Sequence, residues 1–208
     1  MIPLFIDMSG MNVVVFGAGT VGRRKANYFV REAKVTAIGL DLVDGFDQEV
    51  DLVRADIDAV MADWIEWADL VIAATDNREL NDRIAGEASQ QGRLCNRADG
   101  MSDFLIPSVV EKDTFTVAIS TEGRSPAMSR HLRLKLDREL DGRYDSMVRL
   151  QEQLRAEARS KMPSQEEREA FLRDVLDDER IWSLLPNDQQ GAMALAMAMM
   201  EEFNERHF

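Results

Sequence analysis

Residues 12–25 read Asn-Val-Val-Val-Phe-Gly-Ala-Gly-Thr-Val-Gly-Arg-Arg-Lys, and this stretch decides the fold. Its four consecutive apolar residues predict a buried parallel strand. The motif G-x-G-x-x-G follows at once, with its glycines at Gly17, Gly19 and Gly22, and a helix-like run begins within this motif. Such glycines let the backbone turn tightly and approach a pyrophosphate, which the N–H groups at the helix N-terminus then bind. The pattern predicts dinucleotide binding, with a purely structural glycine turn as the alternative.

Further apolar runs alternate with helix-like segments after this stretch. Strands are expected at residues 34–38, 52–54, 69–74 and 93–96, and helices at residues 20–32 and 77–90. Alternating strands and helices are typical of an α/β Rossmann-like fold with a doubly wound parallel sheet. Ligands of such a fold bind beyond the carboxyl ends of the strands.

The predicted cofactor is NAD, bound at that edge of the sheet. Asp41 comes 19 residues after Gly22, where an acidic side chain contacts the ribose hydroxyls. The alternative is a solvated loop acid, with Asp44 and Asp47 as competitors. A carboxylate favours NAD over NADP, although the guanidinium groups of Arg23 and Arg24 could accept a 2′-phosphate. The predicted cofactor-binding residues are Gly17, Gly19, Thr20, Val21, Gly22, Leu40, Asp41, Ala74 and Thr75.

The pattern changes in the second half of the chain. Apolar runs at 104–110 and 114–120 predict an antiparallel hairpin. Ser125 and Pro126 are a good N-cap and first residue for a helix to about residue 140, whose N-terminus beside Arg124 would suit an anion. Beyond this the chain is helical, with a capping box at Ser164 and a Met-rich helix suited to a core or a subunit interface. The expected domains are 1–103, NAD-binding; 104–142, a hairpin and helix; and 143–208, helical.

The composition indicates a globular protein of 208 residues with 45% hydrophobic and 30% charged residues. A formal net charge of −13 argues against a nucleic-acid partner. No apolar run approaches the ~20 residues of a membrane helix, and the N-terminus does not resemble a signal peptide. The single cysteine, Cys95, cannot form an internal disulfide, which favours the cytoplasm.

Four blocks of the first 140 residues together resemble the precorrin-2 dehydrogenase family, the dehydrogenase/ferrochelatase module of siroheme synthases. The blocks are the glycine loop with its trailing Arg-Lys, Ala-Ala-Thr-Asp-Asn, Cys-Asn-Arg-Ala-Asp, and Phe-Leu-Ile-Pro-Ser with a later Gly-Arg-Ser-Pro. They occupy residues 17–25, 73–77, 95–99, and 104–108 with 117–126. The last block is the most specific, because a generic Rossmann domain has no reason to carry it.

The resemblance implies NAD-dependent oxidation of precorrin-2 to sirohydrochlorin, and insertion of Fe2+ in some members. It also implies a homodimer, with residues 104–142 as the dimerisation and substrate segment. The family's acid/base aspartate corresponds to Asp99; without the resemblance this residue would be interpreted as a turn aspartate before Gly100. The residues Arg97, Gly100 and Glu122 depart from the usual pattern. The positive charge of Arg97 could lower the pKa of Asp99 and keep its carboxylate ready to accept a proton.

A tetrapyrrole substrate rich in carboxylates would need a basic surface on this acidic chain. The predicted substrate-binding residues are Arg124, Ser125, Arg130 and His131, and the alternative is a solvated helix face balanced by nearby acids. No permanent metal site is expected, because the two histidines, His131 and His207, lack a partner at helical spacing. Two other functions remain open: an NAD-sensing regulatory module without turnover, and a dehydrogenase for another small acid.

Overall fold

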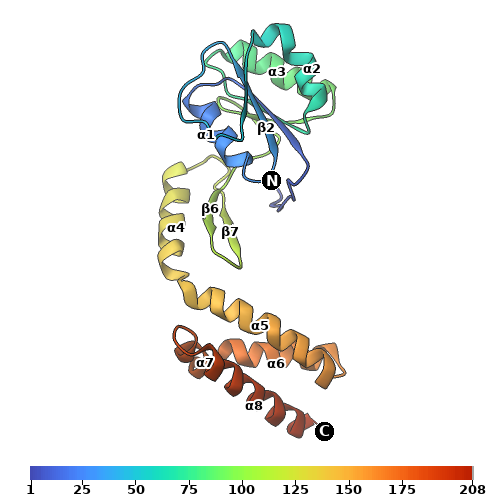
Figure 1. The fold of residues 1–208 in the computed structure, drawn as a ribbon, viewed down its shortest axis with the longest axis vertical. Helices are drawn as coiled ribbons and strands as arrows, with labels where there is room; N and C mark the ends of the chain where they lie inside the picture. Colours follow the sequence, from blue (N-terminus) through green and yellow to red (C-terminus); the bar gives the residue numbers. More distant parts are fainter. Residues whose placement is uncertain (208) are drawn as a thin grey trace. The chain divides into compact units, whose positions relative to one another are not determined.

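The chain forms two compact units in the computed structural model, which describes residues 1–207, with side-chain surroundings through residue 205. The units are Met1–Ile106 and Pro107–Phe208, and each is described by itself. Figure 1 shows the parallel sheet of the first unit and the hairpin and helices of the second. Among the described residues, no helix has the length and apolar character needed to span a membrane.

The first unit is built on a five-stranded parallel sheet in the order β3-β2-β1-β4-β5. This confirms the predicted doubly wound fold, because the chain runs outward from β1 to β3 and then returns to add β4 and β5 on the other side. The order reverses between β1 and β4, so their carboxyl ends border the expected ligand crevice. The strands are Asn12–Phe16 (β1), Lys34–Gly39 (β2), Asp51–Arg54 (β3), Leu70–Ala73 (β4) and Leu94–Arg97 (β5).

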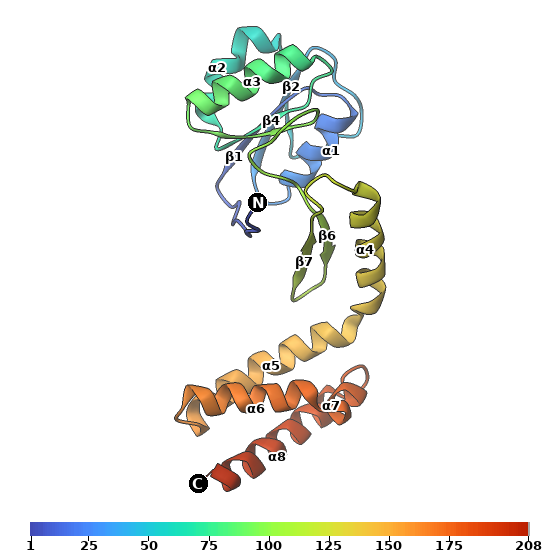
Figure 2. The ribbon, with the colours of Figure 1, turned by 180° about the vertical axis from the view of Figure 1, so that it is seen from behind.

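The sheet is covered on both faces, which explains why β1 is apolar at successive positions. Val13 and Val15 pack with residues of α1 (Thr20–Phe29), whereas Val14 and Phe16 pack with residues of α2 (Ile57–Trp67) and α3 (Arg78–Gln90). Figure 2 shows α2 and α3 together on one side of the sheet and α1 on the other. The two cores hold the strand ends, and therefore the loops that follow them, in fixed positions.

Two predicted boundaries were wrong. Helix α1 ends at Phe29 rather than at residue 32, because the N–H groups of Glu32 and Ala33 both donate to the Phe29 carbonyl oxygen and turn the chain toward β2. Residues 104–107 are not part of the hairpin. Phe104 instead packs edge-on against Phe29, with 6.4 Å between ring centroids, and so belongs to the core of the first unit.

The second unit contains the predicted antiparallel hairpin and a helical region. The hairpin pairs β6 (Ser108–Glu111) with β7 (Thr116–Ile119). Helices α5, α6, α7 and α8 share one core, and the predicted capping box at Ser164 is confirmed. The helices are α4 (Pro126–Glu139), α5 (Gly142–Lys161), α6 (Gln165–Asp177), α7 (Glu179–Leu184) and α8 (Gln189–His207).

Candidate active site

The glycine loop joins β1 to α1 at the carboxyl edge of the sheet. Gly17 has a φ of 105°, in the left-handed region that favours glycine, and a Cβ there would collide with the backbone of Ala74. A Cβ on Gly22 would collide with the carbonyl oxygen of Gly17. These two glycines therefore allow the loop to pack against both α1 and the end of β4.

The N-terminus of α1 has the features that a bound pyrophosphate requires. Its N-cap residue is Gly19, no side chain caps the helix, and its first turn contains no acidic residue. A Cβ on Gly19 would meet no atom within 4 Å, so this position is open where the other two glycines are enclosed. The free N–H groups and the helix dipole can therefore act on an approaching anion. Thr20 and Val21, also predicted to bind the cofactor, are exposed in this first turn.

The loop after β2 lies beside the glycine loop, because the N–H of Val43 donates to the carbonyl oxygen of Ala18 at 3.1 Å. Leu40 is 60% exposed in spite of its apolar side chain, and Asp41 next to it is also exposed. An exposed leucine at this edge suits a ligand with an apolar ring. Arg23 donates from Nη1 to the carbonyl oxygen of Asp44 at 2.5 Å, which ties this guanidinium to the loop.

The loop after β4 is connected to Asp99 by a buried asparagine. Thr75 donates from its N–H at 3.1 Å and from its hydroxyl at 2.7 Å to Oδ1 of Asn81. The side chain of Asn81, which is fully buried, also lies close enough to the carboxylate of Asp99 to lower its pKa. Two predicted cofactor residues, Ala74 and Thr75, and the predicted acid/base residue thus meet at one place in the first unit.

Arg97, the last residue of β5, also contacts Asp99 and hydrogen-bonds to its carboxylate. Its Nε and Nη2 lie 3.3 and 3.2 Å from Oδ1 of Asp99, and its Nη1 pairs with Asp82. Partial burial raises the pKa of Asp99, but the polar side chain of Asn81 and the hydrogen bonds and positive charge of Arg97 outweigh this effect, so the pKa lies below the usual aspartate value. The carboxylate, 29% exposed, is therefore ionised and still accessible.

A second group of polar residues fixes the segment that follows Asp99. Lys25, on α1, hydrogen-bonds to Oδ1 of Asn96, whose Nδ2 donates to the carbonyl oxygen of Phe104 at 2.7 Å. Burial lowers the pKa of Lys25, and the nearby charge of Arg24 adds to the effect. Sequence reasoning did not assign roles to Lys25, Asn81 or Asn96. The available signal was that Lys25 and Asn96 lie in the family-like blocks and that Asn81 follows one of them, but their partners lie 6 to 71 positions away.

The predicted substrate-binding residues all lie in the second unit. Ser125 is the N-cap of α4, as predicted, and its hydroxyl accepts the N–H of Met128 at 3.2 Å. Arg124 is 84% exposed and lies 3.4 Å from a carboxylate oxygen of Glu122. Arg130 and His131 are exposed further along α4. The side chain of His207, the other histidine, lies outside the described residues.

Comparisons with known proteins identify the family of this chain. Residues 4–108 match the family model described as putative NAD(P)-binding. The chain is 33% identical over 211 residues to a precorrin-2 dehydrogenase from Methanosarcina barkeri, a match that covers 97% of this chain and 94% of that protein. The chain belongs to the precorrin-2 dehydrogenase family. As a member of this family it is an NAD-dependent oxidoreductase.

The chain also has relatives that are longer proteins. This precorrin-2 dehydrogenase family member is 28% identical over 200 residues to a siroheme synthase from Salmonella paratyphi A, and it spans only 43% of that protein's length. A siroheme synthase from Nitrosococcus oceani is 30% identical over 206 residues, with 44% of its length covered. A solved structure titled SirC, precorrin-2 dehydrogenase, shares the fold, with a TM-score of 0.70 over 95% of this chain and 100% of that one at 20% identity.

Proposed function

We propose that this protein oxidises precorrin-2 to sirohydrochlorin with NAD+, with Asp99 as the base. The observation that carries the proposal is the position of an ionised carboxylate, Asp99, which Arg97 hydrogen-bonds. It lies beside Asn81, which accepts hydrogen bonds from Thr75 at the edge of the cofactor site. The name of the relative from Methanosarcina barkeri supplies the substrate. We propose further that the enzyme works in the cytoplasm as a homodimer.

The reaction removes a hydride and a proton from the substrate. The nicotinamide, when bound, accepts the hydride. The chain must therefore hold the cofactor phosphates at the N-terminus of α1 and accept the proton on a carboxylate oxygen of Asp99. Arg97 and Asn81 orient this carboxylate and keep it ionised before the proton arrives. After the transfer, Asp99 is neutral and must release the proton before the next turnover.

We assign the substrate carboxylates to the start of α4 in the second unit. The Ser125 hydroxyl, which accepts the Met128 N–H, can still donate its own proton to a carboxylate. The exposed guanidinium of Arg124 is suited to bidentate binding of the same group. Arg130 and His131 would meet further carboxylates along the helix.

The test is an absorption assay with purified protein, NAD+ and precorrin-2. We expect the sirohydrochlorin spectrum to appear and NADH to form in proportion. Asp99→Asn should lower kcat by about 10²- to 10⁴-fold, because the base is removed, while NAD+ affinity stays near that of the wild type. Turnover at the wild-type rate in this variant would remove Asp99 from its role.

The same assay distinguishes the dehydrogenase from the alternative functions. NAD+ binding without any spectral change would favour the regulatory module that senses NAD. Repeating the reaction with Fe2+ tests whether the product is converted to siroheme, the second activity that the resemblance implies for some members of the family. Light scattering of the purified protein, with and without NAD+, measures the mass and tests the predicted homodimer.

A further inference from the structure

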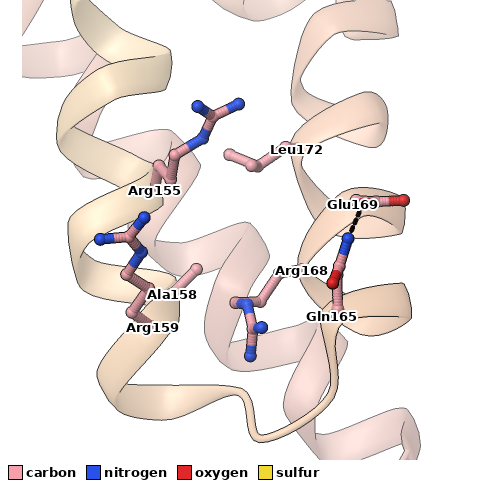
Figure 3. Close-up of a pocket in the computed structure, with 7 residues that line it drawn as sticks. All are labelled: Arg155, Ala158, Arg159, Gln165, Arg168, Glu169 and Leu172. Carbon is pink, nitrogen blue, oxygen red and sulfur yellow. Dashed lines mark hydrogen bonds between the residues drawn. The ribbon is translucent and has the colours of Figure 1, made fainter.

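A cavity of about 350 Å³ lies between α5 and α6 of the second unit, outside the residues used above. Figure 3 shows that α5 contributes two arginines to it and that α6 contributes a third, beside a glutamine and a glutamate. Its lining residues are Arg155, Ala158, Arg159, Gln165, Arg168, Glu169 and Leu172. Its size lies within the usual range of about 300–1,000 Å³ for small-molecule sites.

The charges around this cavity are not balanced. Among the residues that the structure describes, Arg155 and Arg159 have no hydrogen-bond or ion-pair partner, although the chain has 38 acidic and only 25 basic residues. Glu157, which lies between them in sequence, pairs with Lys161 instead, at 3.6 Å. The single acidic residue of the lining, Glu169, accepts a hydrogen bond from Gln165 at 2.7 Å. The lining therefore carries three guanidinium groups against one carboxylate.

Two features of the lining favour a bound anion. Arg155 and Arg159 are four residues apart on α5, where like charges repel each other and an anion between them would relieve the repulsion. Arg168 is held in place, because its Nη1 donates to the carbonyl oxygens of Met162 at 2.8 Å and Pro163 at 3.0 Å. A fixed guanidinium loses little freedom when it binds an oxyanion, and guanidinium groups match carboxylate and phosphate oxygens in pairs.

We propose that this cavity binds a small polyanion through two or more carboxylate or phosphate groups. Arg155 and Arg159 would each bind one anionic group, and the fixed Arg168 would complete the positive surface. The apolar lining residues Ala158 and Leu172 offer little surface on which a ligand's ring could pack, so the site would select its ligand by charge. The proposal does not depend on the dehydrogenase reaction, because it concerns binding at separate residues.

The test uses isothermal titration calorimetry of the full chain at low ionic strength, where charge interactions are least screened. Citrate is the carboxylate probe and pyrophosphate is the phosphate probe. We expect saturable binding of at least one of them, weakened at least about tenfold in Arg155→Gln/Arg159→Gln, since two charge-assisted hydrogen-bonding groups are lost. The control is Arg173→Gln, which removes one positive charge from an exposed position of α6 outside the cavity.

A gain of affinity provides the second test. Glu169→Gln removes the one negative charge of the lining and can still accept a hydrogen bond from Gln165, so it should bind the probe more tightly than the wild type. A misfolded variant would not show this result. The proposal is overturned if neither probe gives saturable heat. It is also overturned if pyrophosphate binding survives in the double variant, because that binding then belongs to the glycine loop. Equal weakening of binding by Arg173→Gln and by the double variant would overturn it as well.

Discussion

The neighbours of Asp99 extend the pH range over which its carboxylate is ionised. Its pKa is lowered, so the carboxylate stays ionised as the pH falls to the usual aspartate value of about 3.9 and becomes protonated only below it. The stabilisation that this ionised group contributes to the fold is present above its unfolded-state pKa and is lost as the pH falls through the folded-state pKa.

Arg97→Gln should therefore move the acid limb of the kcat/KM profile to higher pH. The substitution removes the guanidinium charge and its hydrogen bonds from Asp99, so that the carboxylate accepts a proton more readily. The measurement is the pH dependence of NADH formation. Arg83→Gln is the control, because Arg83 pairs with Asp58 at the surface. An acid limb at the same pH in wild type and Arg97→Gln would contradict the assignment.

Cys95 should be unreactive in the folded protein. Burial raises the pKa of its thiol to about 11, and the nearby carboxylate of Asp103 adds to the effect. Only the thiolate attacks a disulfide reagent, so very little of the reactive form exists at pH 8. We expect no rapid reaction with a chromogenic disulfide reagent in buffer and one thiol per chain in guanidinium chloride. Rapid labelling of the native protein would show that β5 is open to solvent.

The loop between β1 and α1 contains glycines with two different roles, one in packing and one in binding. A side chain at Gly17 or Gly22 would meet backbone atoms, whereas a side chain at Gly19 would extend into open space. The first two positions therefore determine how closely the loop packs. The third determines what can approach the N-terminus of α1.

Gly19→Asp should fold normally and lose NAD+ affinity by at least about tenfold, because a carboxylate would then repel the pyrophosphate at the helix N-terminus. Gly19→Ala is the matched control, since it adds bulk without charge at a position with space for it. Affinity is measured by calorimetry, and folding by the thermal transition. Equal loss in both variants would attribute the effect to bulk rather than to charge.

At the scale of the whole molecule, the first unit has the cores and the loops that a cofactor-binding domain needs. Phe104 and Ile106 pack against the core beneath α1, so the unit ends after these residues. This places its end a few residues beyond the expected NAD-binding domain, 1–103. The domain boundaries of the dimerisation and helical segments stay predictions.

A fragment of residues 1–106 should therefore fold cooperatively and bind NAD+ with an affinity close to that of the full chain. It should not oxidise precorrin-2, because the proposed carboxylate-binding residues begin at Arg124. A fragment of residues 1–97, which lacks Phe104 and the Asp103 carboxylate that accepts the Cys95 N–H at 2.8 Å, is the control and should melt at lower temperature. Turnover by the 1–106 fragment would place the substrate site within the first unit.

Sequence reasoning predicted the features that depend on short spacings. The apolar run before the glycines, the N-caps at Ser125 and Ser164, and the five strands are confirmed, because strand burial and helix capping act within a few residues. It also predicted that Arg97 lowers the pKa of Asp99, two positions away in the chain. The roles of the named site residues in binding and catalysis stay predictions.

The amino-acid pattern is enough to predict the parallel sheet, the glycine loop and the family of this protein, since periodicity and motif spacing are local properties of the chain. The folded structure is needed to see that Asn81 lies between Thr75 and Asp99, that Lys25 holds Asn96, and that Arg155 and Arg159 face one cavity with α6. These contacts join residues from different elements. Their partners depend on how helices pack against strands and against each other, and no spacing within a single element encodes that packing.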